Sequence, residues 1–229
     1  MDRLIRWAQS VVYRALYGNP DRAVVCGFFD ATPRRAGVSV VGPIIRDEVR
    51  QVEPSTGDYL LVYVSKGDQE YTPPLERAIL DMGYPAKVYG APRIGRSGVV
   101  EFKPLSNRAF LEDLAGCRAV FATTGNQLIG EVMHLGKPML GMPIDCLEQR
   151  INALYLDRLG IGMSVKRKDV NARVLRDFLN RCDAFGDNLG RLPRDGRSEA
   201  MRALEVYLQE LAGTAARGGS QIPRWQSER

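Results

Sequence analysis

The sequence predicts an α/β protein with a Rossmann-like parallel sheet flanked by helices and a short N-terminal annex. First, from Asp58 onward short apolar runs alternate with helical segments, which is the pattern of a doubly wound sheet. Second, an apolar strand at 119–122 leads through a small-residue turn into a helix. Third, 229 residues with 45% hydrophobic content suffice for one good core and a small annex.

Each element follows from local pattern. Strands are predicted at 22–29, 38–41, 59–64, 86–90, 99–102, 119–122, 139–142 and 162–165. Helices are predicted at 2–17, 73–82, 107–116, 147–159, 169–181 and 197–212, with another from the turn at 123–125. Pro73 and Pro74 suit the first turn of their helix, and Gly83 ends it. Residues 43–212 form the main domain, whereas 213–229, rich in Gly, Ser, Arg and Gln, form a disordered tail.

Composition excludes several classes of protein. Four scattered cysteines and a single histidine give neither a metal site nor a disulfide framework, so a reducing cytoplasm is expected. No apolar run reaches transmembrane length. The net charge is +5, but the basic residues are spread along the chain, and no nucleic-acid partner is expected. The amphipathic helix at 2–17 packs on the domain or, as an open alternative, contacts a membrane surface peripherally.

The stretch at 119–131 is a candidate phosphate site. A helix that opens directly after a strand and a small turn presents unpaired amides and the positive end of its dipole. Neither a dinucleotide fingerprint nor a Walker loop accompanies it, because Gly90 to Gly95 has the wrong spacing and Ser65-Lys66-Gly67 lacks the preceding glycine. The chain therefore has a phosphate-binding pattern without the commonest motifs.

Several motifs in fixed order resemble the donor-binding half of a GT-B glycosyltransferase. They are residues 110–120, Thr123-Thr124-Gly125 to Glu131, Gly136-Lys137-Pro138, Pro143, Glu148-Gln149, Asn152-Ala153 and 159–162. The chain is similar to the nucleotide-sugar transferases that include the cell-wall N-acetylglucosaminyltransferases, over about residues 38–212. Val41-Gly42-Pro43 resembles the interdomain linker of that family. The resemblance implies that residues 1–42 are the linker and the end of an acceptor domain that is otherwise absent.

The resemblance also implies a site for a uridine-diphosphate sugar, used as donor substrate without a cofactor or a metal. Amides at 123–127 would hold the diphosphate, with Ser65 and Lys66 facing it. Glu131 would accept hydrogen bonds from the ribose hydroxyls. The implied diphosphate residues are Thr123, Thr124, Gly125, Asn126, Gln127, Ser65 and Lys66. The implied base residues are Phe102, Lys103 and Leu105, whose backbone would pair with the base edge. The implied sugar residues are Glu148 and Gln149. For each, the alternative is an ordinary structural role, as a helix start, a charged turn or a surface residue.

The chain departs from the family pattern at Thr124, Gln127 and Leu128, where relatives carry a second glycine, asparagine and a hydroxyl. A leucine side chain cannot bond phosphate. No catalytic base is identified, since His134 lies on the helix after Glu131 and the base belongs to the acceptor half. The expected partners are a nucleotide sugar and an acceptor-domain polypeptide. Two alternatives stay open: a non-catalytic nucleotide-sugar-binding subunit and a Rossmann-like enzyme such as an epimerase.

Overall fold

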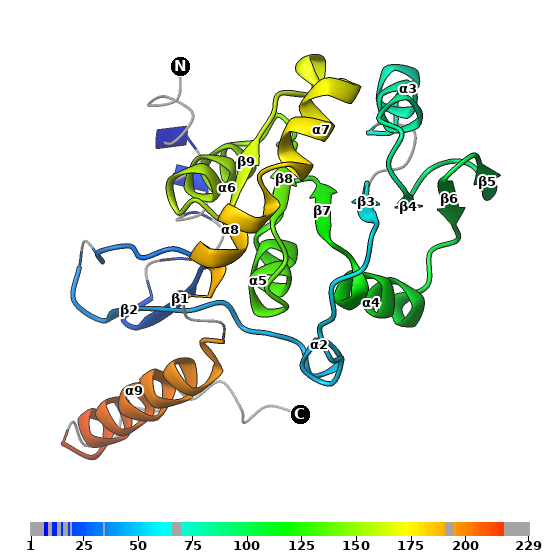
Figure 1. The fold of residues 1–229 in the computed structure, drawn as a ribbon. Coiled ribbons are helices and arrows are strands. Elements are labelled where there is room, and N and C mark those ends of the chain that lie inside the picture. Colours follow the sequence, from blue (N-terminus) through cyan, green and yellow to red (C-terminus); the bar gives the residue numbers. More distant parts are fainter. Residues whose placement is uncertain are drawn as a thin grey trace, which may run out of the picture.

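The computed structural model describes residues 7–8, 11–12, 15, 18, 20–33, 35–65, 70–190 and 195–217. Its centre is a seven-stranded sheet with the order β5-β6-β4-β3-β7-β8-β9 (Figure 1). The strands are β3 (Leu60–Tyr63), β4 (Ala86–Tyr89), β5 (Gly95–Ser97), β6 (Val100–Lys103), β7 (Ala119–Ala122), β8 (Met139–Gly141) and β9 (Gly162–Ser164). All pair in parallel except β5, which lies antiparallel to β6 at one edge. The predicted α/β class is confirmed.

The strand order reverses between β3 and β7. From β3 the chain builds outward through β4 and β6, then returns to pair β7 with the other side of β3 and continues through β8 and β9. Open parallel sheets bind their ligands in the crevice at the carboxyl ends of the strands at such a reversal. This topology marks the loops after Tyr63 and Ala122 as the place to look for a site.

Helices cover both faces of the sheet (Figure 1). The helices are α2 (Asp47–Arg50), α3 (Pro73–Asp81), α4 (Asn107–Gly116), α5 (Asn126–His134), α6 (Leu147–Arg158), α7 (Ala172–Leu179), α8 (Cys182–Leu189) and α9 (Arg197–Arg217), with a 3-10 turn η2 (Arg167–Asp169). One core packs α3, α7 and α8 on one face. The other packs α4, α5 and α6 on the opposite face. Alternation along β3 feeds both cores: Leu60 and Val62 enter the first, and Leu61 enters the second.

The annex is a two-stranded parallel sheet of β1 (Ala23–Cys26) and β2 (Val38–Val41), against which α9 packs. Phe28 is buried in the second core and the ring of Phe29 stacks on Tyr155 of α6, with 3.7 Å between centroids. The chain passes between the annex and the domain twice, at Gly42-Pro43 and at Gly196. These two segments are in contact, because the Gly196 amide donates to the Pro43 carbonyl at 2.8 Å. A Cβ at Gly196 would lie 2.2 Å from the Gly42 carbonyl oxygen, so this close crossing requires glycine.

The structure differs from the sequence predictions in several elements. The strand predicted at 22–29 is confined to β1 and is only half-buried, with Val25 49% exposed. The helix predicted to end at 212 continues to Arg217 in α9, and residues 218–229 of the predicted tail lie outside the described residues. The sequence prediction missed β5, α2 and α8. The strand β5 has only three residues, Gly, Arg and Ser, with no apolar side chain, and the helices α2 and α8 have only four and eight residues.

The predicted helix at 2–17 lies mostly outside the described residues. Of this segment Trp7, Ala8, Val11, Val12 and Ala15 are described, and they are helical and exposed. Whether the segment packs on the domain or contacts a membrane surface stays a prediction. Within the ranges given above, no helix combines the length and the apolar character needed to cross a bilayer.

Candidate functional site

A cavity of about 500 Å³ lies at the reversal of strand order. Its lining comes from the carboxyl end of β3, the starts of α4 and α5, and the segments before α2 and within α6. The lining residues are Arg46, Tyr63, Ser65, Leu105, Ser106, Asn107, Phe110, Thr123, Gly125, Gln127, Leu128, Glu131 and Gln149. Six of them belong to the implied diphosphate, ribose or sugar residues: Ser65, Thr123, Gly125, Gln127, Glu131 and Gln149.

The start of α5 forms one wall of the cavity. Gly125 is the N-cap, and no side chain caps the helix. The first amide bonded within the helix is that of Ile129, which donates to the Gly125 carbonyl at 3.1 Å. The amides of Asn126, Gln127 and Leu128 therefore have no partner within the helix, and the positive end of the helix dipole faces the same side. This wall suits an anion.

The Thr124 amide is engaged differently from the prediction. It donates to Gln149 Oε1 at 3.1 Å, and the Ile144 amide donates to the same oxygen at 3.1 Å. The Thr124 hydroxyl donates to the Gln149 carbonyl at 2.8 Å, and Asn152 Nδ2 donates to the Thr124 carbonyl at 2.9 Å. In this structure Gln149 holds the β7–α5 loop onto α6, so a contact between the Thr124 amide and a phosphate requires Gln149 to move.

Glu131 lies at the cavity with its carboxylate only 3% exposed. Arg46 forms a bidentate ion pair with this carboxylate: Nε donates to Oε1 at 2.7 Å and Nη2 donates to Oε2 at 3.2 Å. Gln127 Nε2 donates to Oε1 at 3.0 Å. The hydrogen bond with Glu131 raises the pKa of Arg46 above its ordinary value. The surface-glutamate alternative for Glu131 is wrong, because a surface residue would be exposed.

The implied base residues separate in the structure. Leu105 lines the cavity and is 72% exposed. The Phe102 ring is buried in the first core, and the Lys103 ammonium bonds Asp113 on α4. Lys66 lies outside the described residues. Of these three residues only Leu105 places its side chain at the cavity. The implied pairing of the backbone near 102–105 with the base edge stays a prediction.

Sequence reasoning missed several residues that line the cavity. Arg46 follows the annex–domain crossing, while Ser106, Asn107 and Phe110 come from the start of α4. The Ser106 hydroxyl caps α4 by accepting from the Ala109 amide at 3.4 Å. Phe110 packs its ring near those of Tyr63 and Tyr89 and adds an aromatic wall. The sequence feature that could have indicated this wall is a helix-capping residue, Ser106, followed by an aromatic residue, Phe110, shortly after a strand.

A second cavity, of about 610 Å³, begins on the other side of the start of α5. Gly125 lines the first cavity and its neighbour Asn126 lines the second. Glu148, implied for the sugar, lines the second cavity with apolar residues of the annex and α6, among them Val25, Phe29 and Ile151. The annex therefore contributes directly to the space next to the predicted diphosphate position.

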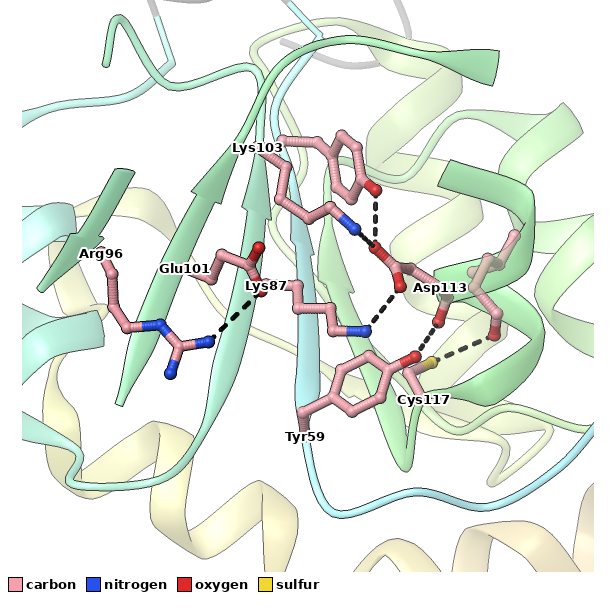
Figure 2. Close-up of polar contacts among 9 residues, drawn as sticks. Tyr59, Lys87, Arg96, Glu101, Lys103, Asp113 and Cys117 are labelled. Atoms are coloured by element: carbon pink, nitrogen blue, oxygen red, sulfur yellow. Dashed lines mark hydrogen bonds and ion pairs between the residues drawn. The ribbon is translucent and has the colours of Figure 1, made fainter. Parts of the chain in front are cut away.

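A polar cluster lies between α4 and the sheet (Figure 2). Asp113 accepts from Lys87, Lys103 and Tyr89, each at 2.6 Å. Burial raises the pKa of Asp113, but the bonds from Lys103, Lys87 and Tyr89 outweigh it and hold that pKa below its ordinary value. The Tyr59 hydroxyl donates to the Asp113 backbone carbonyl at 2.7 Å. None of these residues lines either cavity, so the cluster fixes α4 on the sheet.

Cys117 and Lys137 are buried and line neither cavity. Burial raises the pKa of the Cys117 thiol to about 12, so this thiol stays protonated at neutral pH. In the described part of the chain no group of three or more His, Cys, Asp or Glu side chains could hold a metal ion. Lys137, from the Gly-Lys-Pro motif, is buried and donates to the carbonyls of Ser55 and Cys117, which is a structural role.

The fold and the cavity define a doubly wound α/β protein with a ligand crevice at its point of strand reversal. The chain belongs to glycosyl transferase family 1, which matches residues 2–183. No curated protein sequence matches the chain significantly. The family match and the fold together confirm the GT-B glycosyltransferase assignment.

Solved glycosyltransferases share the fold at low sequence identity. The glycotransferase of kitacinnamycin is 18% identical with a TM-score of 0.65, covering 91% of this chain and 61% of its own. The calicheamicin glycosyltransferase CalG4 is 19% identical with a TM-score of 0.60, covering 89% and 61%. UGT2 of Phytolacca americana, solved with UDP-2fluoro-glucose and pterostilbene, is 18% identical with a TM-score of 0.56, covering 80% and 48%. The chain thus spans about 61% of the length of the first two structures.

Proposed function

We propose that the chain is the donor domain of a glycosyltransferase and binds a nucleoside-diphosphate sugar, uridine-linked, for transfer of a hexosyl or N-acetylhexosaminyl group. One observation carries the proposal: the uncapped start of α5 and the carboxylate of Glu131 line one cavity at the point of strand reversal. Free amides suit a diphosphate, and a carboxylate one to two turns further along the same helix suits the hydroxyls of a ribose.

The proposed donor would lie across both cavities. The nucleoside would occupy the first cavity between Leu105 and Phe110, with its ribose on Glu131. The diphosphate would cross the start of α5 at Gly125 and Asn126. The sugar would enter the second cavity beside Glu148. This order follows the arrangement of the lining residues.

The chemistry proposed for this chain is stabilisation of the leaving group. As the bond from the anomeric carbon to the diphosphate breaks, negative charge grows on the phosphate oxygens. Preorganised amides at the start of α5 would stabilise that charge, without a metal ion. The base that removes the acceptor proton would come from an acceptor-binding half, provided by another chain or by further sequence.

A non-catalytic nucleotide-sugar-binding subunit is the second candidate. Two observations favour it. Leu128 provides an apolar side chain at the cavity, and the Thr124 amide is already bonded to Gln149. Both reduce the number of donors available to a diphosphate.

Calorimetric titration with UDP, dTDP, UDP-glucose and UDP-N-acetylglucosamine tests the donor site. Binding of at least one of them is expected, and the absence of binding at millimolar concentration would contradict the proposal. Co-expression with a cognate acceptor-domain polypeptide then separates the two candidates. Gain of sugar transfer supports the enzyme, whereas nucleotide binding with no transfer supports the non-catalytic subunit.

A further inference from the structure

The carboxylate of Glu131 already accepts hydrogen bonds at most of its acceptor positions. It accepts two bonds from Arg46 and one from Gln127, while a carboxylate offers about four acceptor positions. Two ribose hydroxyls need two positions. At least one existing bond must therefore break before a ribose can be held by both hydroxyls.

Arg46 is the partner able to leave. Its side chain is 36% exposed, whereas Glu131 is 3% exposed, so water can compensate the guanidinium but not the carboxylate. Arg46 lies just before α2, and its Nη1 also reaches Asn107 Oδ1 at 3.4 Å on the opposite wall. Its side chain thus spans the cavity from α4 to α5.

A diphosphate gives the released guanidinium a new partner. Among the described residues that line the first cavity, Arg46 is the only cationic side chain. The α5 amides provide partial positive charge, but a diphosphate carries full negative charges. The guanidinium fork that now fits a carboxylate fits a phosphate equally well.

We propose that Arg46 exchanges partners when donor binds: it leaves Glu131 to the ribose hydroxyls and bonds the diphosphate. The inference rests on the proposed function of the cavity. It makes Arg46 a specificity-determining residue, because a nucleoside without phosphates must break the ion pair and offers the guanidinium nothing in return. The site therefore selects for the diphosphate over the nucleoside.

Titration of Arg46→Gln with uridine and with UDP tests the exchange, with uridine followed by ligand-detected NMR. UDP affinity should fall about tenfold or more, because charge-assisted bonds are lost. Uridine affinity should stay or rise, because no ion pair remains to be broken. The ratio of UDP affinity to uridine affinity should thus fall at least about tenfold. Arg46→Lys, which keeps the charge but loses the fork, should retain part of the UDP affinity.

Arg108→Gln is the matched control. This substitution removes the same charge near the start of α4. The Arg108 side chain is 91% exposed, pairs only with Glu112 among the contacts described, and does not line the cavity. The ratio of UDP affinity to uridine affinity should be the same in Arg108→Gln as in the wild type. An unchanged ratio in both Arg46 variants would overturn the exchange and leave Arg46 a fixed support of Glu131. Failure of the wild-type chain to bind UDP, dTDP or either UDP-sugar would instead overturn the proposed function, and the exchange with it.

Discussion

Two buried carboxylates on neighbouring helices show how similar chemistry serves different ends. Asp113 of α4 and Glu131 of α5 are 7% and 3% exposed, and each is held by cationic and neutral donors. The partners of Asp113 lie between α4 and the sheet (Figure 2), and they line neither cavity. The partners of Glu131 line the first cavity. Both acids are buried, so burial does not distinguish them. What distinguishes the candidate binding carboxylate from the structural one is that its hydrogen-bond partners line a cavity.

The two carboxylates are also linked. Asp113 fixes α4 on β4 and β6, and the start of α4 provides Asn107 and Phe110 to the cavity wall. The structural cluster therefore supports the cavity wall from behind, and the Tyr89 ring of the cluster packs on Phe110 of that wall. Substitutions at the two acids should separate stability from binding.

The largest expected effect is on stability. Asp113→Ala should lower the free energy of unfolding by roughly 2–4 kcal/mol, below the loss for a fully buried pair because Lys87 and Lys103 are 27% and 22% exposed. Urea unfolding measures it. Asp183→Ala removes an aspartate that is 94% exposed and should change stability by less than about 0.5 kcal/mol. Equal effects of the two substitutions would contradict the structural role of Asp113.

The Asp113 contribution should depend on pH. Its pKa in the folded state lies below the unfolded value, so its contribution is present above the unfolded pKa, about 4, and is lost as pH falls through the folded pKa. The stability gap between wild type and Asp113→Asn should thus be constant near neutral pH and shrink below about pH 4. Unfolding curves across this range measure the gap. A gap independent of pH would mean that the charge of Asp113 adds nothing.

The next effect is on binding. Glu131→Gln should weaken nucleotide binding by roughly 1.5–3 kcal/mol, the value of hydrogen bonds to a charged group. The free energy of unfolding should change less than in Asp113→Ala, because the released Arg46 side chain is partly exposed and can be hydrated. Calorimetry with UDP measures the affinity. Glu112→Gln, a surface substitution on α4, should leave it unaltered. Matching affinities for Glu131→Gln and wild type would remove Glu131 from the site.

The smallest effect concerns the departure from the family pattern at Leu128. Leu128→Ser places a hydroxyl on the first turn of α5 at the cavity, so UDP affinity should improve by roughly 0.5–1.5 kcal/mol, the net value of one hydrogen bond. Calorimetry with UDP measures the gain, and uridine is the control ligand, because its affinity for Leu128→Ser should not improve. A similar gain for both ligands would show that the hydroxyl does not reach the phosphates.

The sequence predicted the parts that are local. The strand at 119–122, the turn and the helix carrying Glu131 could be found from order and spacing alone, and they lie where the topology expects a ligand. Arg46 could not be found this way, because 85 positions separate it from Glu131 and only the fold brings them together. Gln149 and Lys103 could be named from the sequence, but their contacts also depend on the fold: Gln149 holds the Thr124 amide, and the Lys103 ammonium bonds Asp113.

The most direct test of the central claim is a crystal structure of the chain with UDP. We expect the diphosphate within hydrogen-bonding distance of the Asn126 and Gln127 amides, with both ribose hydroxyls on the Glu131 carboxylate. Density for the nucleotide in another part of the molecule, or a ribose that leaves Glu131 untouched, would contradict it.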